Sequence, residues 1–415
     1  MRPGFVTLVV AVLTWLCCAC SGVSSNEEGN LSAERTGSTA MALASRGAPD
    51  RELLHRCGAG SPTPTGAERL LRAPFLQQVH DRGAILVFQD KLGLSTRVRV
   101  TRFDGTEVTT LSSAPDPNAP GVLQQLVSLD GLEPGHGYCY ELVGLTEPAG
   151  FFTAPAPGAV APVQFAVFGD SGSGDSDQRH LRAQLSTVPL DFLLHTGDLA
   201  YQDGSAAQIN GTVFGIYRDL LKSFSFFPVP GNHEYASQRA APYLQAFVLP
   251  ENGDPDGLER YYSFDWGDVH FVALDTEQIG QRQAAWLDAD LSRNQLPWTI
   301  AYGHRPPFSS GEHGSDGAFQ KWFVPLLEQH GVQLVLSGHD HDYERTKAIN
   351  GVTYVVTGGG GVGTRPVGFS DFTAFSESVI HFVYIEIFAD TLRLHAIDGV
   401  GREFDQVLIS RDFSP

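Results

Sequence analysis

Five apolar segments between residues 163 and 341 each end in a glycine followed by a side chain that can bind a metal ion. They are VQFAVFGD (163–170), LDFLLHTGD (190–198), FFPVPGNHE (226–234), WTIAYGH (298–304) and VQLVLSGHDH (332–341). Short apolar segments that alternate with helical stretches are typical of buried strands in an α/β sheet. Because open α/β sheets carry their sites at the carboxyl ends of their strands, we expect these side chains to converge.

Residues 163–410 are therefore predicted to form an α/β (α+β) domain of two packed β-sheets flanked by helices. Helices are expected near 177–188, 212–224, 281–294 and 317–330. After residue 350 the chain is mostly β, with strands at GVTYVVTGG, HFVYIEIFA, TLRLHAID and DQVLIS. The glycine run TGGGGVG (357–363) lacks the Lys-Ser/Thr of a phosphate-binding P-loop, and we interpret it as a tight turn at the rim of the site.

Residues 67–155 have a different pattern, with short alternating segments at 84–88, 96–103, 123–129 and 138–144. This spacing predicts an immunoglobulin-like β-sandwich. Tyr138 follows Leu132, Pro134 and Gly135 as in a tyrosine corner, and the region resembles a fibronectin type III module. A Pro/Ala-rich linker (153–162) joins it to the next domain.

The amino terminus has the pattern of an export signal over residues 1–20, with Arg2 before an apolar run and small residues after it. Cys18 or Cys20 could be lipidated, but neither has a leucine three residues before it, so ordinary cleavage stays open. Residues 21–66 predict a flexible tether. We expect an exported protein that is periplasmic, extracellular or anchored at the cell surface by a lipid.

Charge and the remaining cysteines limit the partners of the chain. The 47 acidic and 28 basic side chains give a net charge of -19, which argues against binding of nucleic acid or anionic lipid by the general surface. Membrane attachment would then depend on an amino-terminal lipid alone. Cys57 and Cys139 either pair in an oxidising compartment or remain buried thiols, and neither has a neighbour at zinc-ligand spacing.

Six metal-binding side chains follow the predicted strands: Asp170, Asp198, Asn232, His304, His339 and His341. Taken singly, each has an ordinary structural explanation, since an aspartate often caps a helix and a histidine often packs in a core. Together they match a dinuclear centre, in which one carboxylate bridges two ions and O and N donors are divided between them. Asp198 is the predicted bridge.

The ordered motifs GDSG, GDLAY, GNHE, the His of AYGH, and GHDHDYER resemble those of the purple acid phosphatases, within the calcineurin-like metallophosphoesterases. The resemblance spans residues 163 to about 405. The sandwich before it resembles the amino-terminal domain that these enzymes often carry. One departure is Ala301, where a valine is usual three residues before the motif histidine.

The resemblance implies ligands for two metals. The wider superfamily has D-x-H in its first motif, but residue 172 is Gly here, so one ligand is missing. Tyr201 matches the position of a tyrosinate that binds ferric iron and gives a charge-transfer colour. The implied Fe(3+) ligands are Asp170, Tyr201, His341 and the shared Asp198. The implied ligands of a divalent Fe, Zn or Mn ion are Asp198, Asn232, His304 and His339.

The resemblance also implies roles around the metals. His233 matches the donor of a proton to the leaving group, and His313 is the candidate for a second such histidine. Asn232, His233, His313 and Arg305 would contact the substrate, although Arg305 could equally be an ion-pair residue at the surface. Tyr343, Glu344 and Arg345 are expected to orient the ligand loop.

We therefore predict an exported dinuclear metal-dependent acid phosphatase that hydrolyses small phosphomonoesters by attack of a metal-bound hydroxide. A phosphodiesterase or nucleotide hydrolase on the same fold and metal site is the alternative. A third hypothesis is a cell-surface binding protein with a degenerate site, although every ligand position holds a competent residue. The sequence does not decide the natural substrate, the second metal or the oligomeric state.

Overall fold

The computed structural model describes Cys57 and residues 63–411 of the chain. The predicted export signal, the candidate lipid sites Cys18 and Cys20, and most of the predicted tether lie outside these residues. Within the described part, no helix is both long enough and apolar enough to cross a membrane.

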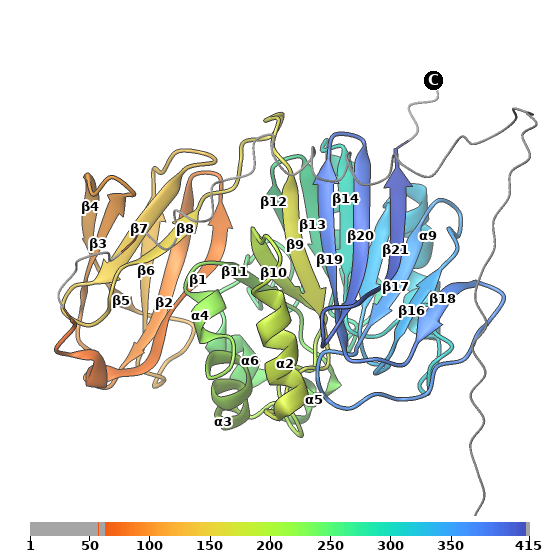
Figure 1. Ribbon diagram of the computed structural model, residues 1–415, viewed down its shortest axis with the longest axis horizontal. Coiled ribbons are helices and arrows are strands. Elements are labelled where there is room, and N and C mark those ends of the chain that lie inside the picture. The colour runs from red at the N-terminus through yellow and green to blue at the C-terminus, as the bar shows by residue number, and fades with distance from the viewer. Residues whose placement is uncertain (1–56, 58–62, 412–415) are drawn as a thin grey trace, which may run out of the picture. The chain divides into compact units, whose positions relative to one another are not determined.

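Residues 70–152 form two four-stranded antiparallel sheets, as the alternating segments predicted (Figure 1). One has the order β1 (Leu70–His80), β2 (Gly83–Asp90), β6 (Gln124–Asp130), β5 (Ala114–Pro115), and the other β4 (Glu107–Ser112), β3 (Arg97–Arg102), β7 (Gly137–Leu142), β8 (Ala149–Phe152). The hydroxyl of Tyr138 accepts the backbone N–H of Glu133 at 2.9 Å, which is the contact expected of a tyrosine corner. The fibronectin type III resemblance and the domain limits stay predictions.

Cys57 and Cys139 form a disulfide, so the structure decides between the two states that the sequence left open. Cys139 lies on β7 and is buried. Cys57 is thereby held covalently to the sheet that β7 belongs to.

Removing this disulfide with the double substitution Cys57→Ala and Cys139→Ala is expected to lower the free energy of unfolding. The bond joins residues 82 positions apart, and closing a loop of that size is worth about 4 kcal/mol in the chain-entropy model. Chemical denaturation of both proteins without reductant measures the difference. An unchanged denaturation midpoint in the double variant would contradict the expectation.

Residues 163–410 contain a six-stranded and a seven-stranded sheet. The first has the order β11 (Ser225–Pro228), β10 (Phe192–His195), β9 (Val163–Phe168), β19 (His381–Phe388), β20 (Thr391–Asp398), β21 (Glu403–Ser410). The second has the order β12 (Tyr262–Trp266), β13 (Val269–Ala273), β14 (Trp298–Tyr302), β15 (Leu334–Ser337), β17 (Thr353–Thr357), β16 (Tyr343–Thr346), β18 (Thr373–Glu377).

Aromatic side chains fill the space between these two sheets. The rings of Phe227 on β11 and Phe264 on β12 stack with their centroids 3.8 Å apart. Phe165 on β9 packs edge-on against Phe271 on β13, with centroids 5.3 Å apart. The predicted α/β fold with two packed sheets is confirmed, although β12 and β13 were not predicted as strands.

Helices follow several strands, as expected, but two predicted helices are wrong in detail. The correctly predicted ones are α2 (Ser176–Leu185) and α7 (Gln281–Arg293). The predicted helix at 212–224 is instead a π-helical turn (Asn210–Phe214) and the short α4 (Arg218–Leu221), which follow α3 (Ala206–Ile209). Gly211 and Gly215 in this stretch weaken a regular helix.

The predicted helix at 317–330 is divided into α8 (Gly317–Trp322) and α9 (Val324–Gln329). Pro325 occupies the first turn of α9, where its missing N–H costs nothing; inside a continuous helix it would remove a hydrogen bond. The other α-helices among the described residues are α5 (Asn232–Ala236) and α6 (Ala241–Ala246), both after β11.

Candidate metal centre

All seven predicted metal ligands lie just beyond the carboxyl ends of parallel strands. β10 pairs in parallel with both β9 and β11, and β14 pairs in parallel with β15. Asp170 follows β9, Asp198 and Tyr201 follow β10, Asn232 starts the helix after β11, His304 follows β14, and His339 and His341 follow β15.

Three of these residues have a left-handed backbone that side chains other than glycine rarely adopt. The φ angles are 56° at Asp170, 55° at Asp198 and 70° at His339. The backbone N–H of Asp170 donates to Gly197 O at 3.0 Å, and that of His339 donates to Asp170 Oδ2 at 2.9 Å. Such strained residues concentrate at functional sites, where the surrounding structure holds them in place.

Tyr201 joins the first group of predicted ligands. Its hydroxyl donates toward Asp170 Oδ1 at 3.1 Å and Asp198 Oδ2 at 3.0 Å, and it lies 3.3 Å from His341 Nε2. His341 Nε2 is in turn 3.6 Å from Asp170 Oδ1. The phenol therefore lies among the side chains predicted to share its metal.

Gly172 explains why Tyr201 can reach this position. A Cβ atom at residue 172 would lie 2.3 Å from Leu199 O and 2.4 Å from Ala200 Cα. The Gly172 carbonyl also accepts the backbone N–H of Tyr201 at 3.1 Å. A histidine at 172 would not fit without moving this backbone, so the missing histidine and the inserted tyrosine belong to one local arrangement.

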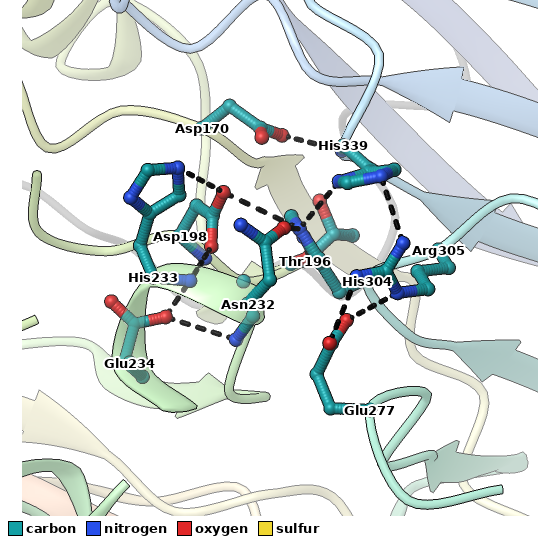
Figure 2. Close-up of polar contacts among 12 residues, drawn as sticks. Asp170, Thr196, Asp198, Asn232, His233, Glu234, Glu277, His304, Arg305 and His339 are labelled. Carbon is teal, nitrogen blue, oxygen red and sulfur yellow. Dashed lines mark hydrogen bonds and ion pairs between the residues drawn. The ribbon is translucent and has the colours of Figure 1, made fainter. Parts of the chain in front are cut away.

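The second group surrounds His304 (Figure 2). Its Nε2 atom lies 3.0 Å from Asn232 Oδ1, 3.1 Å from His339 Nδ1 and 3.4 Å from Asp198 Oδ2. Ligand atoms of Asp198, His304 and His339 all lie within 4.8 Å of one another, and all three residues are buried. Asp198 is therefore the residue whose carboxylate touches both groups.

Two of the three predicted ligand imidazoles are neutral, which is the state that metal binding requires. Burial lowers the pKa of His339 to about 2 and that of His341 to about 4. Both rings are thus neutral at physiological pH and present a lone pair. His304 differs. Burial lowers its pKa, but the charge and hydrogen bond of Asp198, together with the charges of Asp170 and Glu277, outweigh burial and raise the pKa to about 10.

The acidic groups at the site lie close together in a buried position, where a positive charge would stabilise their ionised forms. Burial would raise the pKa of Asp198, but the charges and hydrogen bonds of His304 and His233 together outweigh it and hold this pKa below its usual range. Burial and the charge of Asp198 raise the pKa of Asp170 well above its usual value. Burial and both carboxylates likewise raise that of Tyr201. Cations between these groups would reverse the repulsion.

The donor set therefore fits a pair of metal ions. Two carboxylates, a phenol and an amide oxygen meet three imidazoles, and such O/N sets suit Fe, Zn and Mn. Among the described residues, the ion-pair contacts of Asp170 and Asp198 are to histidines alone. The assignment of each residue as a ligand stays a prediction.

The two predicted proton donors flank the site on different sides. The ring of His233 lies 4.2 Å from that of Tyr201, and its Nε2 is 3.7 Å from Asp198 Oδ2. The ring of His313 stacks on His339 with centroids 4.2 Å apart. Both candidates therefore lie next to predicted metal ligands, and His313 is brought there by a loop after β14.

Arg305 reaches the site but is already engaged by a carboxylate (Figure 2). It contacts Glu277 through Nε at 2.7 Å and Nη2 at 3.0 Å, and its Nη1 lies 3.1 Å from His339 Nε2. Glu277 was not predicted from the sequence. This pairing favours the ion-pair alternative for Arg305 over a free phosphate contact.

The three predicted supporting residues lie on β16 and act at a distance from the ligands. Tyr343 Oη and Arg345 Nε both donate to Asp405 Oδ2 at 2.7 Å. Glu344 accepts the backbone N–H of Ser310 at 2.6 Å. They hold the strand after His341 and the loop that leads to His313.

Two further supporting carboxylates, besides Glu277, were missed. Glu234 is fully buried and accepts backbone N–H groups from Gly231 (2.9 Å), Asp198 (3.0 Å), Leu199 (2.9 Å) and Ala200 (3.1 Å). Asp340 accepts the backbone N–H of His313 at 2.8 Å. Glu234 had one usable signal, since a glutamate three residues after Gly231 at the start of a helix is a capping pattern. No comparable signal marks Asp340.

Substituting Glu234→Gln is expected to weaken metal binding by about 10- to 100-fold. The amide keeps one acceptor oxygen but turns its NH₂ group toward two backbone N–H donors of the loops that carry Asp198 and Asn232. Metal affinity can be measured by competition with a chelator. The exposed Glu107→Gln is the control, and equal affinities in the two variants would rule out this supporting role.

Comparison with known proteins finds similar sequences and folds. The sequence model of the calcineurin-like phosphoesterase family matches residues 163–343. The chain is 28% identical over 351 residues to acid phosphatase type 7 of Danio rerio, covering 69% of this chain and 77% of that protein. It is 30% identical over 257 residues to purple acid phosphatase 21 of Arabidopsis thaliana, covering 57% of each.

Solved structures agree on the fold. Purple acid phosphatase PPD1 from yellow lupin (Lupinus luteus) superimposes with a TM-score of 0.70 at 20% identity, covering 82% of this chain and 74% of that one. The structure of PhoD gives a TM-score of 0.63 at 14% identity, covering 85% of this chain and 90% of that one.

Proposed function

We propose that this chain, a member of the calcineurin-like phosphoesterase family related to the purple acid phosphatases, is an exported dinuclear acid phosphatase that hydrolyses phosphomonoesters. The observation that carries the proposal is the position of the Asp198 carboxylate, which touches both groups of predicted ligands. The similarity to acid phosphatase type 7 and purple acid phosphatase 21 supports the phosphatase activity. Export rests on the predicted signal at residues 1–20.

Each group of donors would hold one ion. Asp170, Tyr201, His341 and Asp198 would hold ferric iron, because an anionic phenolate suits a hard trivalent ion. Asp198, Asn232, His304 and His339 would hold a divalent Fe, Zn or Mn ion. When bound, the pair supplies Lewis acidity and lowers the pKa of water so that a nucleophile exists at mildly acidic pH.

His233 would donate a proton to the leaving group. Its Nδ1 atom faces the backbone carbonyl of Gln202, so this nitrogen carries a proton and donates it to that oxygen. The other nitrogen, Nε2, faces the Asp198 side of the site. The side chain is 30% exposed, so a substrate oxygen can approach it. In its protonated form this ring can donate a proton to the departing alkoxide.

Parallel assays on p-nitrophenyl phosphate, bis(p-nitrophenyl) phosphate and ATP test the proposal across about pH 4 to 8. We expect the monoester to be hydrolysed at acidic pH and the diester to be a poor substrate. Faster hydrolysis of the diester would favour a phosphodiesterase on the same site. Protein that holds two metals yet hydrolyses none of the three would favour the binding-protein hypothesis.

A further inference from the structure

A second arginine, which the sequence reasoning did not single out, lies at the rim of the site. Arg365 belongs to the segment between β17 and β18, after the glycine run 357–363. Its backbone N–H donates to the His341 carbonyl at 3.0 Å, and its carbonyl accepts the Ser378 hydroxyl at 2.6 Å. Val362, three residues earlier, donates its N–H to the Asp170 carbonyl at 3.1 Å. Arg365 is thus held against two ligand-bearing segments.

The guanidinium of Arg365 points toward the site through His313. Its Nη1 atom contacts His313 Nε2. The His313 ring in turn stacks on the ring of His339, with centroids 4.2 Å apart. Burial, followed by the charge of Arg365, lowers the pKa of His341. One imidazole therefore separates the guanidinium from a predicted metal ligand.

The two arginines at the site differ in how closely each is paired with a carboxylate. Arg305 makes two short contacts to Glu277, whose side chain is only 10% exposed. The ion pair of Arg365 is to Glu312, at 3.6 Å, and the Glu312 side chain is 63% exposed. An exposed pair at that separation contributes little and exchanges easily with another anion. The Arg365 side chain is itself 31% exposed, so a ligand can reach it.

We propose that Arg365 binds a second phosphate on the leaving group, so that the enzyme favours bisphosphorylated substrates over simple monoesters. The proposal rests on the proposed phosphomonoesterase function. A phosphate held between the metals would be near His339, whereas Arg365 lies beyond the His313 ring and so meets a more distant group of the substrate. A guanidinium binds phosphate with two parallel hydrogen bonds, and in a chain with a net charge of -19 a local cation is needed for a polyanion.

The matched substrates are propyl phosphate and propane-1,3-diol bisphosphate, which differ in the second phosphate alone. The bisphosphate has two equivalent ester groups, which alone raise kcat/KM by a factor of about two. In the wild type we expect kcat/KM for the bisphosphate to be higher by at least about a further tenfold. Arg365→Ala should bring this ratio close to that factor, mainly through KM, and Arg365→Lys should restore part of it. The control is Arg82→Ala, which removes an exposed charge of the sandwich and should leave the ratio unchanged.

A wild-type ratio at the statistical factor, or a ratio that Arg365→Ala does not change, would overturn the proposal. Calorimetric measurement of propane-1,3-bisphosphonate and propylphosphonate binding tests the role of Arg365 separately from the proposed phosphatase function, since neither compound is hydrolysed. If the wild type hydrolyses neither ester, the phosphatase proposal fails, and the role of Arg365 is judged from the binding of the two phosphonates alone. Preference for the bisphosphonate that is lost in Arg365→Ala supports the role of Arg365, and equal preference in both proteins contradicts it.

Discussion

The Asp198→Asn variant is expected to lose at least about a thousandfold in kcat/KM on a phosphomonoester and to bind fewer metal ions than the wild type. The Oδ2 atom of its carboxylate lies 3.0 Å from the Tyr201 hydroxyl and 3.4 Å from His304 Nε2, so one substitution affects both predicted metals. Asparagine removes the negative charge but preserves the shape of the side chain. It also tolerates the left-handed backbone at this position better than most residues do.

A matched control separates this effect from a loss of folding. Asp116 is buried in the sandwich, where it accepts a hydrogen bond from Gln124 at 2.7 Å. We expect Asp116→Asn to keep its metals and its activity even if its stability falls. Thermal unfolding of both variants shows whether they are folded. A folded Asp198→Asn protein with wild-type activity would remove Asp198 from the mechanism.

The Tyr201→Phe variant is expected to lose visible absorption while keeping the fold. The substitution removes only the hydroxyl, which is the atom that lies among Asp170, Asp198 and His341. The aromatic ring can still pack against His233. A charge-transfer band between tyrosinate and ferric iron requires the phenol oxygen, so we expect the band to disappear and the first metal to bind more weakly.

Tyr343→Phe makes the same chemical change at a different place. The Tyr343 hydroxyl donates to Asp405 and contacts no predicted metal ligand among its described hydrogen bonds. This variant should keep the absorption band of the wild type. Absorption spectra recorded with metal analysis on both variants give the answer, and a coloured Tyr201→Phe protein would refute the tyrosinate assignment.

Much of this site could be predicted because its residues directly follow short buried strands. Asp170 and His304, for example, come two residues after β9 and β14, and parallel pairing brings such ends together. Gly172 and Tyr201 could be connected through the family resemblance, which implies a tyrosinate at residue 201 where the histidine of the first motif is missing. The structure adds the reason, which is the close approach of residues 199–201 to Gly172.

The supporting residues could not be predicted in the same way. Glu277 meets Arg305 from a loop 28 positions earlier, and Arg365 meets His313 from 52 positions later. Neither pair leaves a periodic or motif-like pattern in the sequence, because the contact depends on how two loops fold over the sheet edge. The interrupted helices had local signals in Gly211, Gly215 and Pro325, which the apolar pattern outweighed in the prediction.

We propose that a pair of metal ions at Asp198 makes this chain a phosphomonoesterase. The metal content of the purified protein, measured with hydrolysis of p-nitrophenyl phosphate before and after chelation, tests this proposal. We predict about two ions per chain and activity that disappears with the ions and returns when they are restored. Full activity in metal-free protein, or two bound ions without hydrolysis, would contradict the account.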